Sequence, residues 1–343
     1  MDTIDDTILV TGASGFIGSR LALELARRGA RVRVLVRSGE FSMPPNLDPE
    51  LSCDRLEVVK GDVTDVSSLP RAMQGCRYVY HLAGRASNWA SDPRTYHNVN
   101  VQGLRNVLDV AEANRIERIV WTSTVVTFQP TKPGEIADES TPRTIPFFTE
   151  YERSKAQGEE LAQQYASRGV PVVIVNPSRV YGPGHLTESN SLVKIIDMYD
   201  RGRAPFMLGC GRPVGNYVFI DDVVQGLILA MQRGQPGRRY LIGGQNASFR
   251  EFFDTVDRVS GKRHFRIPIR RPAAMTVAYF YQLRANWFGV HPEITPPWIR
   301  HFLMDWAYST RRAEQELGYK HVTLEEGIRR TYQWLTEVRE SRQ

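Results

Sequence analysis

Cysteine is scarce in this sequence, and the few cysteines present do not form a recognisable site. The chain of 343 residues contains three of them, Cys53, Cys76 and Cys210, which are far apart and make no C-x-x-C pair. Their odd number and wide spacing argue against a disulfide framework and against a zinc centre. We therefore expect a protein of a reducing compartment without a metal site.

Long apolar runs are also missing. No stretch approaches the ~18 apolar residues that a membrane-spanning helix requires. The first six residues include three aspartates and no basic residue, whereas a secretory signal begins with basic residues. We expect a cytoplasmic protein with no transmembrane segment.

The sequence has no strong excess of one charge. Lys and Arg number 44 and Asp and Glu 38, for a formal net charge of +6, and the two signs are interspersed. No aromatic and basic platform accompanies the short basic clusters, so we expect no nucleic-acid partner.

The hydrophobic content of 41% is typical of globular proteins, and the length exceeds that of one usual core. One large domain with a smaller companion is predicted.

Short apolar runs alternate with helical patterns over the first half of the chain. Because the runs are apolar on both faces, the alternation predicts a parallel sheet covered on both sides, which is an α/β doubly wound (Rossmann) fold. The expected strands cover residues 7–10, 31–36, 56–59, 78–82, 118–122 and 172–175, and the expected helices 17–28, 67–74, 100–114 and 151–168.

After Pro177 this alternation stops. Loops rich in proline and glycine follow, and from about Asn246 the pattern is mostly helical and rich in aromatic residues. Residues 217–231 still resemble a strand leading into a helix, and residues 239–242 another strand, so the chain is expected to return to the first domain. We predict a Rossmann domain of residues 1–178 and 214–245, and a smaller, mostly helical substrate-binding region of residues 179–213 and 246–343.

A glycine-rich turn joins the first expected strand to the first expected helix, with the sequence T-G-A-S-G-F-I-G at residues 11–18. Gly12 allows a tight turn, Gly15 lets backbone N–H groups approach a pyrophosphate, and Gly18 lets the helix pack closely on the strand. The spacing differs from G-x-G-x-x-G, but its place between a strand and a helix indicates a dinucleotide site. A glycine turn without a ligand is the alternative.

Two polar residues at strand ends suggest how the adenosine half of a dinucleotide would be held. Arg37 ends the second expected strand, where a guanidinium suits the 2′-phosphate of NADP and an acidic residue would suit the 2′-hydroxyl of NAD. Asp62 ends the third strand and could hydrogen-bond adenine. A solvated arginine and an ordinary turn-forming aspartate are the alternatives.

Tyr151 and Lys155 stand four residues apart at the start of an expected helix, so they share one face of it. With a pKa of ~10, a phenol is a poor acid or base at neutral pH, but a neighbouring ammonium and a cationic nicotinamide both favour the phenolate. Such a pair can exchange a proton with a carbonyl or alcohol oxygen. By itself, a tyrosine and a lysine at this spacing are common and do not identify a catalytic site.

Together these motifs resemble the extended short-chain dehydrogenase/reductases, the NAD-dependent epimerase/dehydratase superfamily. The resemblance covers residues 7–260 and is closest to the dihydroflavonol-4-reductase-like and hopanoid-associated reductases, followed by the 3β-hydroxysteroid dehydrogenases. It is carried by the glycine turn, G-D-V at 61–63, H-L-A-G at 81–84, V-N-V-Q-G at 99–103, W-T-S-T at 121–124, the Tyr151 and Lys155 pair, N-P-S-R-V-Y-G-P-G at 176–184 and F-I-D-D-V at 219–223.

The resemblance implies roles for individual residues. Tyr151 would be the acid/base, Lys155 would hold the nicotinamide ribose, and Thr124 would polarise the substrate carbonyl where most members have serine. Ser123 is a rival for that last role. Asn100 would position a loop, and His81 would be a wall of the cofactor site. The implied cofactor contacts are Gly12, Ser14, Gly15, Phe16, Ile17, Arg37, Asp62, Val63, Leu82, Ala83, Gly84, Thr122, Tyr151, Lys155, Pro177, Ser178 and Val180.

The implied function is NADP(H)-dependent reduction of a ketone or aldehyde to an alcohol, or the reverse, on a small and largely apolar substrate, with NAD the less favoured cofactor. Two alternatives stay open: a nucleotide-sugar epimerase or dehydratase with bound NAD, and a non-catalytic NADP-binding sensor or scaffold.

The family also suggests a homodimer packed through residues 100–114 and 151–168. The aromatic segments could line an apolar substrate pocket, pack as a helical core or touch a membrane surface, and they lie at residues 278–281, 287–288, 296–298 and 302–306.

Overall fold

The structure of the protein, a computed structural model, describes residues 6–45, 55–87, 89–185, 190–203, 206–289, 292 and 294–341. Cys53 and the acidic residues 1–5 lie outside the described residues. Cys76 and Cys210, which lie within them, are free thiols.

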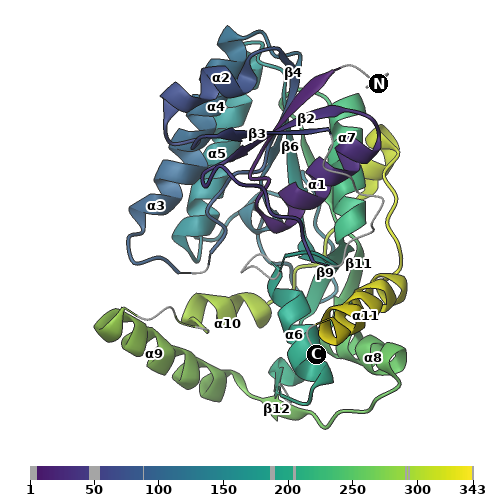
Figure 1. Cartoon of the computed structure of the whole chain (residues 1–343). Helices are drawn as coiled ribbons and strands as arrows, with labels where there is room; N and C mark the ends of the chain where they lie inside the picture. Colours follow the sequence, from purple (N-terminus) through teal and green to yellow (C-terminus); the bar gives the residue numbers. More distant parts are fainter. Residues whose placement is uncertain are drawn as a thin grey trace.

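A seven-stranded parallel sheet forms the centre of the molecule (Figure 1). Its order is β10-β6-β5-β4-β1-β2-β3. Ile8, Leu9 and Val10 are fully buried, as expected for a strand covered on both faces. The predicted doubly wound fold is confirmed. The strands are β1 (Thr7–Thr11), β2 (Arg31–Val36), β3 (Leu56–Lys60), β4 (Cys76–His81), β5 (Arg118–Thr122), β6 (Val172–Pro177) and β10 (Arg239–Ile242).

The strand order reverses at β1, which pairs with β2 on one side and with β4 on the other. In open parallel sheets, ligands bind beyond the carboxyl ends of the strands at such a reversal. Here Thr11 ends β1 and lies opposite His81 at the end of β4. The glycine turn therefore begins at the point where a doubly wound sheet usually binds its ligand.

Helices cover both faces of the sheet and enclose two apolar cores. Leu21 and Leu227 belong to the core under the first layer, whereas Leu104 and Leu161 belong to the core under the second. The first layer holds α1 (Phe16–Arg27) and α7 (Ile220–Arg233), and the second holds α2 (Leu69–Met73), α4 (Gly103–Ala113) and α5 (Glu150–Ser167) (Figure 1). The short α3 (Arg94–His97) enters α4 through a π-helical turn, Asn98–Gln102.

Most of the remaining chain lies beyond the carboxyl ends of the main sheet, whereas residues 313–319 return to pack against α7 in the first core. It contains one small sheet of β11 (Gln245–Ser248), β9 (Val214–Phe219) and β7 (Arg179–Tyr181), and a pair formed by β12 (Ile267–Ile269) and β8 (Phe206–Leu208). Its helices are α6 (Ser191–Asp200), α8 (Phe249–Ser260), α9 (Arg271–Phe288), α10 (Pro296–Phe302) and α11 (Leu324–Glu340).

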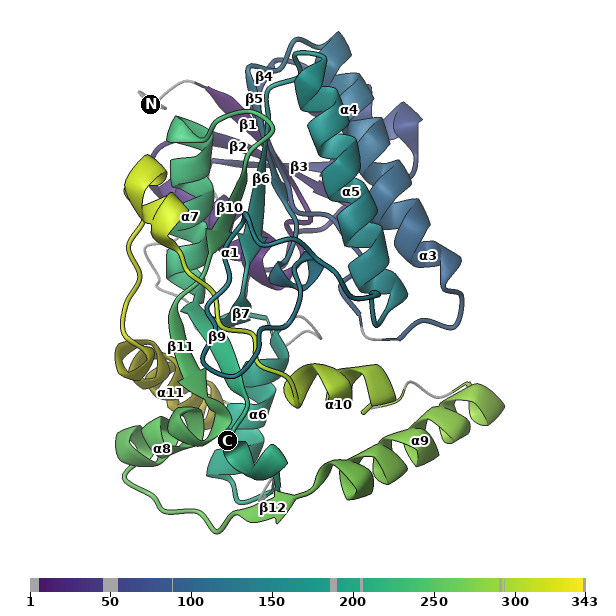
Figure 2. The same ribbon diagram turned by 180° about the vertical axis from the view of Figure 1, so that it is seen from behind.

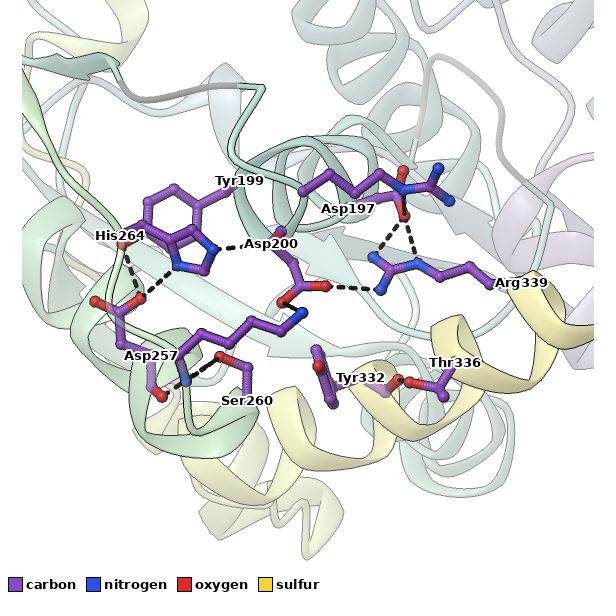
Figure 3. Close-up of polar contacts among 11 residues, drawn as sticks. Asp197, Tyr199, Asp200, Asp257, Ser260, His264, Tyr332, Thr336 and Arg339 are labelled. Atoms are coloured by element: carbon purple, nitrogen blue, oxygen red, sulfur yellow. Dashed lines mark hydrogen bonds and ion pairs between the residues drawn. The ribbon is translucent and has the colours of Figure 1, made fainter.

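A polar cluster ties α6, α8 and α11 together (Figure 3). Asp200 is only 4% exposed, and its two oxygens bind Lys262 at 2.9 Å and Arg339 at 2.7 Å. Asp257 on α8 accepts a 2.9 Å hydrogen bond from Tyr199 on α6. In this part of the fold, a buried carboxylate is thus matched by cations from other elements.

The helix α9 stands away from the sheet, with α10 packed against it (Figure 2). Its aromatic residues are largely exposed, among them Phe280, Trp287 and Phe288. Neither α9 nor any other helix in the described part of the chain combines the length and the apolar character needed to cross a bilayer.

Candidate active site

Three glycines shape the turn between β1 and α1. Gly12 has φ +70°, and a Cβ there would lie 2.6 Å from the backbone nitrogen of Ala83. A Cβ on Gly18 would lie 2.2 Å from the carbonyl oxygen of Gly12. The Gly15 N–H donates to that same carbonyl oxygen at 2.9 Å, and Gly15 caps α1. Side chains at Gly12 and Gly18 would prevent this close packing, which brings the amino end of α1 to the cavity described next.

A cavity of about 640 Å³ lies beyond the carboxyl ends of β1, β2 and β4. It brings together the residues that the sequence predicted as catalytic or as direct cofactor contacts, from elements that are far apart in the chain. Those that line it are Gly12, Ser14, Gly15, Phe16, Ile17, Arg37, Asp62, Val63, Leu82, Ala83, Gly84, Thr122, Thr124, Tyr151, Lys155, Pro177, Ser178 and Val180.

The cavity wall fits a dinucleotide. The side-chain oxygens of Thr122 and Ser178 are buried and have no hydrogen-bond partner in the described chain, so a ligand with donors and acceptors would satisfy them. The glycine cradle at Gly12 supplies N–H groups at the start of α1, where a pyrophosphate binds well. These residues could hold a nicotinamide dinucleotide.

The residues predicted for the adenosine end line the same cavity. Arg37 is exposed and makes no hydrogen bond or ion pair to any described residue, so its guanidinium is available to a ligand. One carboxylate oxygen of Asp62 accepts from the N–H and the hydroxyl of Thr64, both at 2.9 Å. Asp62 therefore forms a local turn, which was the alternative to a role in binding adenine. Its second carboxylate oxygen accepts no hydrogen bond from Thr64.

Tyr151 and Lys155 lie in the first turns of α5, which begins where the Thr149 side chain accepts a hydrogen bond from the Glu152 N–H. The Lys155 ammonium is 4% exposed and donates to the carbonyl oxygen of Thr122 at 2.9 Å. Burial lowers the pKa of Lys155 to about 8. The lysine is therefore still mostly charged at neutral pH.

The phenol of Tyr151 behaves differently from the sequence-based expectation. Burial raises its pKa to about 12, and the hydrogen bond with the Thr124 hydroxyl only partly opposes this rise. We expected Lys155 to favour the phenolate, but without a bound nicotinamide desolvation of the phenol outweighs charge effects. Tyr151 thus holds its proton at neutral pH and faces the cavity as an acid.

The structure distinguishes between the two rival hydroxyls at the end of β5. Ser123 donates to the buried carboxylate of Glu159 at 2.6 Å, and that carboxylate also accepts from Thr127 at 2.8 Å. Thr124 instead faces Tyr151, and its carbonyl oxygen is held by the Asn176 side chain at 2.9 Å. The Thr124 hydroxyl therefore lies beside Tyr151 in the cavity, whereas the Ser123 hydroxyl is bound to Glu159.

Asn100 and His81 both support the site from behind. Asn100, in the π-helical turn, accepts from the Arg85 N–H at 2.7 Å and donates to the Ser154 hydroxyl at 2.8 Å, so it positions a loop. His81 is fully buried and bonds the Thr11 hydroxyl through Nδ1 at 2.7 Å. It is not among the residues that line the cavity, so it is not the wall we expected. Burial lowers its pKa to about 3, with a contribution from Lys155, and keeps it neutral.

An apolar pocket was only one of three interpretations of the aromatic segments, and the structure bears it out for α10. Trp298, His301 and Phe302 line the cavity, and Arg179 at the start of β7 contacts the last two of them. Of the aromatic segments, those on α10 therefore reach the cavity, whereas Trp287 and the other large residues of α9 are exposed. Periodicity cannot separate these two cases, because both segments are aromatic helices. Among the described residues, no cluster of His, Cys, Asp and Glu could hold a metal ion.

Comparisons with known proteins agree with this geometry. The sequence model of the NAD dependent epimerase/dehydratase family matches residues 8–243. A putative dihydroflavonol 4-reductase of Synechocystis is 30% identical over 334 residues, which cover 96% of this chain and 94% of that protein. The 4-hydroxy-2-methyl-3-oxo-4-farnesyl-3,4-dihydroquinoline-1-oxide ketoreductase of Stigmatella aurantiaca is 29% identical, over 93% of each chain. The crystal structure of gox2253 aligns with a TM-score of 0.79 at 29% identity, covering 97% of this chain and 98% of that one.

Proposed function

The chain belongs to the NAD dependent epimerase/dehydratase family and shares its oxidoreductase character, and we propose that it uses NADP(H) to interconvert a carbonyl and an alcohol on a small, largely apolar substrate. The observation that carries the proposal is the pairing of the Tyr151 phenol with the Thr124 hydroxyl inside the cavity that begins at the glycine turn. Two neutral hydroxyls side by side can both donate to one substrate oxygen.

The chain's own residues divide the work of holding the cofactor. The N–H groups at the start of α1, around Gly15, would bind the pyrophosphate, and Lys155 would bind the nicotinamide ribose. Pro177 and Ser178 would lie against the nicotinamide. When bound, the nicotinamide supplies or accepts a hydride, and the protein provides orientation and electrostatics.

Tyr151 and Thr124 would act on the substrate oxygen. Thr124 orients the carbonyl by donating a hydrogen bond, and Tyr151 transfers its phenolic proton as the oxygen becomes an alcohol. The phenolate left behind is stabilised by the nearby ammonium of Lys155, which the pKa of about 8 leaves mostly charged at neutral pH. With a pKa of about 12 the phenol is protonated at neutral pH, which is the form that can donate a proton to a carbonyl oxygen.

The preference for NADP(H) is supported by Arg37. Its guanidinium is exposed at the end of β2, lines the cavity and pairs with no described carboxylate. A phosphate on the adenosine ribose would give it a charge-assisted partner.

A homodimer packed through α4 and α5 is part of the same proposal. The two helices cover the same face of the main sheet and lie side by side in both views (Figures 1 and 2). Light scattering combined with size-exclusion chromatography would test it, and a monomer at micromolar concentration would contradict it.

The two alternative functions make different demands on the site. A nucleotide-sugar epimerase or dehydratase would retain NAD through purification, and its turnover would consume no free cofactor. A sensor or scaffold would bind NADPH without turning over any carbonyl. The apolar wall formed by Trp298 and Phe302 favours a less polar substrate than a nucleotide sugar.

The deciding experiment follows NADPH oxidation by the purified protein against aldehydes, β-keto acyl compounds, steroids, flavonoids and nucleotide sugars. Tyr151→Phe serves as the matched inactive variant. Turnover that wild type shows and the variant lacks is the expected result. Bound NAD with epimerised sugar, or tight NADPH binding without turnover on the whole panel, would replace this proposal with one of the alternatives.

A further inference from the structure

Arg179 brings a positive charge into the part of the cavity formed by α10. It opens β7, directly after Ser178, and its guanidinium carbon lies 4.6 Å from the ring centre of Phe302. Two of its nitrogens donate at 3.5 Å, one to the Tyr217 hydroxyl and the other to the carbonyl oxygen of His301. Its Nε is buried and has no partner in the described chain.

These contacts, which include the faces of the Tyr217 and Phe302 rings, give the charge of Arg179 no anionic partner. Both hydrogen bonds are at the long limit and go to neutral atoms, and no carboxylate in the described chain forms an ion pair with it. Burying a charge without a counter-ion is costly, so proteins usually supply one. The missing partner of Arg179 is therefore expected to arrive with a ligand.

Two other charged side chains of this fold, both largely buried, are paired. The Arg143 guanidinium, near the same cavity, binds Glu152 at 3.2 Å and the carbonyl oxygens of Val126 and Pro146. Asp200, described above, has two cations around it (Figure 3). Against this pattern, the unpaired guanidinium at Arg179 is an exception that lies in the cavity wall.

The surroundings of Arg179 define what else the ligand must carry. Leu192, Pro297, Trp298 and Phe302 line this end of the cavity. His301 adds no charge, because burial holds its pKa well below the ordinary value, and the charges of Arg179 and Arg143 lower it further. The site thus offers one cation within an apolar wall, at a different part of the cavity from the glycine turn that would bind the cofactor's pyrophosphate.

We infer that Arg179 binds the oxyanion of an amphiphilic substrate, a carboxylate on an otherwise apolar body. This inference rests on the proposed function for the reacting end of that substrate, which Tyr151 and Thr124 meet in the same cavity. The substrate class is therefore a hydroxy acid or oxo acid with a hydrophobic remainder. A diphosphate on a nucleotide carries the same kind of oxyanion, and the experiment separates the two sources.

The test is a binding measurement that needs no turnover. Isothermal titration calorimetry on the NADPH complex would compare dodecanoate with dodecanol, which has the same chain without the charge. Wild type should bind dodecanoate tighter by roughly 10-fold or more, the scale of a charge-assisted hydrogen bond. Arg179→Gln should abolish that difference and leave dodecanol binding unchanged, and Arg179→Lys should restore part of it.

Two further variants serve as controls for this measurement. Arg300→Gln removes the same charge from the exposed face of α10, next to His301, and should keep the wild-type discrimination. Arg179→Met keeps an apolar contact with Phe302, so it separates loss of charge from loss of folding, which thermal melting would report.

Several results would overturn the inference. These are equal affinities for the two ligands in wild type, no binding of either ligand, or discrimination that survives Arg179→Gln. If UDP binds in an Arg179-dependent manner and dodecanoate does not bind, the anion is a diphosphate and the carboxylate assignment is wrong. Because binding is measured directly, failure of every carbonyl in the turnover panel would count against the proposed function and would leave this result intact.

Discussion

The hydroxyl of Ser123 donates a 2.6 Å hydrogen bond to the buried carboxylate of Glu159. The same carboxylate oxygen accepts from Asn176, whose amide also holds the carbonyl oxygen of Thr124. Ser123 and Glu159 are thereby part of the support that fixes the end of β5, and the neighbouring Thr124 is the hydroxyl that meets Tyr151. Mutations of these two adjacent hydroxyls are therefore expected to have different effects.

Thr124→Val should lower kcat at least about 10-fold, the scale of one lost hydrogen bond to a charge that develops in the transition state, whereas Thr124→Ser should retain activity because it keeps the donor. Ser123→Ala is the matched control, expected to reduce stability more than kcat because it leaves Glu159 short of one donor. Steady-state kinetics and thermal melting of the three variants would check this. A Ser123→Ala enzyme that is well folded but less active than Thr124→Val would reverse the assignment.

Tyr151→Phe should lower kcat by at least about 100-fold, the scale of general-acid catalysis, with nearly unchanged affinity for NADPH. The phenol would meet the substrate oxygen and no part of the cofactor's phosphates, so chemistry and cofactor binding should separate. Tyr96→Phe is the control, because that ring lies 6.5 Å from Tyr151 and its hydroxyl bonds the carbonyl oxygen of Ser87 instead. Wild-type turnover by Tyr151→Phe under chemistry-limited conditions would show that another group supplies the proton.

The pH profile should report Lys155. Its pKa of about 8 is lowered from the usual lysine value by burial, so the ammonium is present below pH 8 and lost above it. Because kcat/KM reports the free enzyme, kcat/KM for NADPH should fall as the pH rises through about 8. His81, with a pKa of about 3, and Tyr151, with a pKa of about 12, cannot produce a change there.

Lys155→Met tests the origin of this decline. The variant should be weaker at every pH in both cofactor binding and turnover, and its profile should lack the decline near pH 8. If the decline persists in Lys155→Met, the titrating group is another residue.

Wild type should bind NADPH more tightly than NADH, and Arg37→Ala should reduce that preference by roughly 10-fold, the low end of a charge-assisted hydrogen bond, because Arg37 is exposed. NADH affinity should change little, and the difference between the cofactors should become less sensitive to salt. Arg31→Ala removes the same charge from the opposite end of β2, outside the cavity, and should leave the preference intact. Nicotinamide fluorescence titrations would decide, and equal affinities in wild type would mean that Arg37 only faces solvent.

Local patterns in the sequence were enough to predict the strands and helices of the main sheet and the residues around the glycine turn. Apolar runs and helical periods repeat over short distances, so the parallel strands could be predicted without knowing their partners. The glycine turn and the Tyr151 and Lys155 pair are also local, because their spacing within one turn or one helix sets their geometry.

Which polar groups have hydrogen-bond or ionic partners depends on the tertiary structure. Ser123 and Thr124 are chemically alike and adjacent, and their roles differ because Glu159, from the middle of α5, bonds one and not the other. The unpaired charge of Arg179 likewise emerges only when β7 meets α10. The aromatic helices α9 and α10 have similar composition, yet packing against the cavity buries much of one and leaves the other exposed. Such differences depend on contacts between distant segments, which neither periodicity nor residue type encodes.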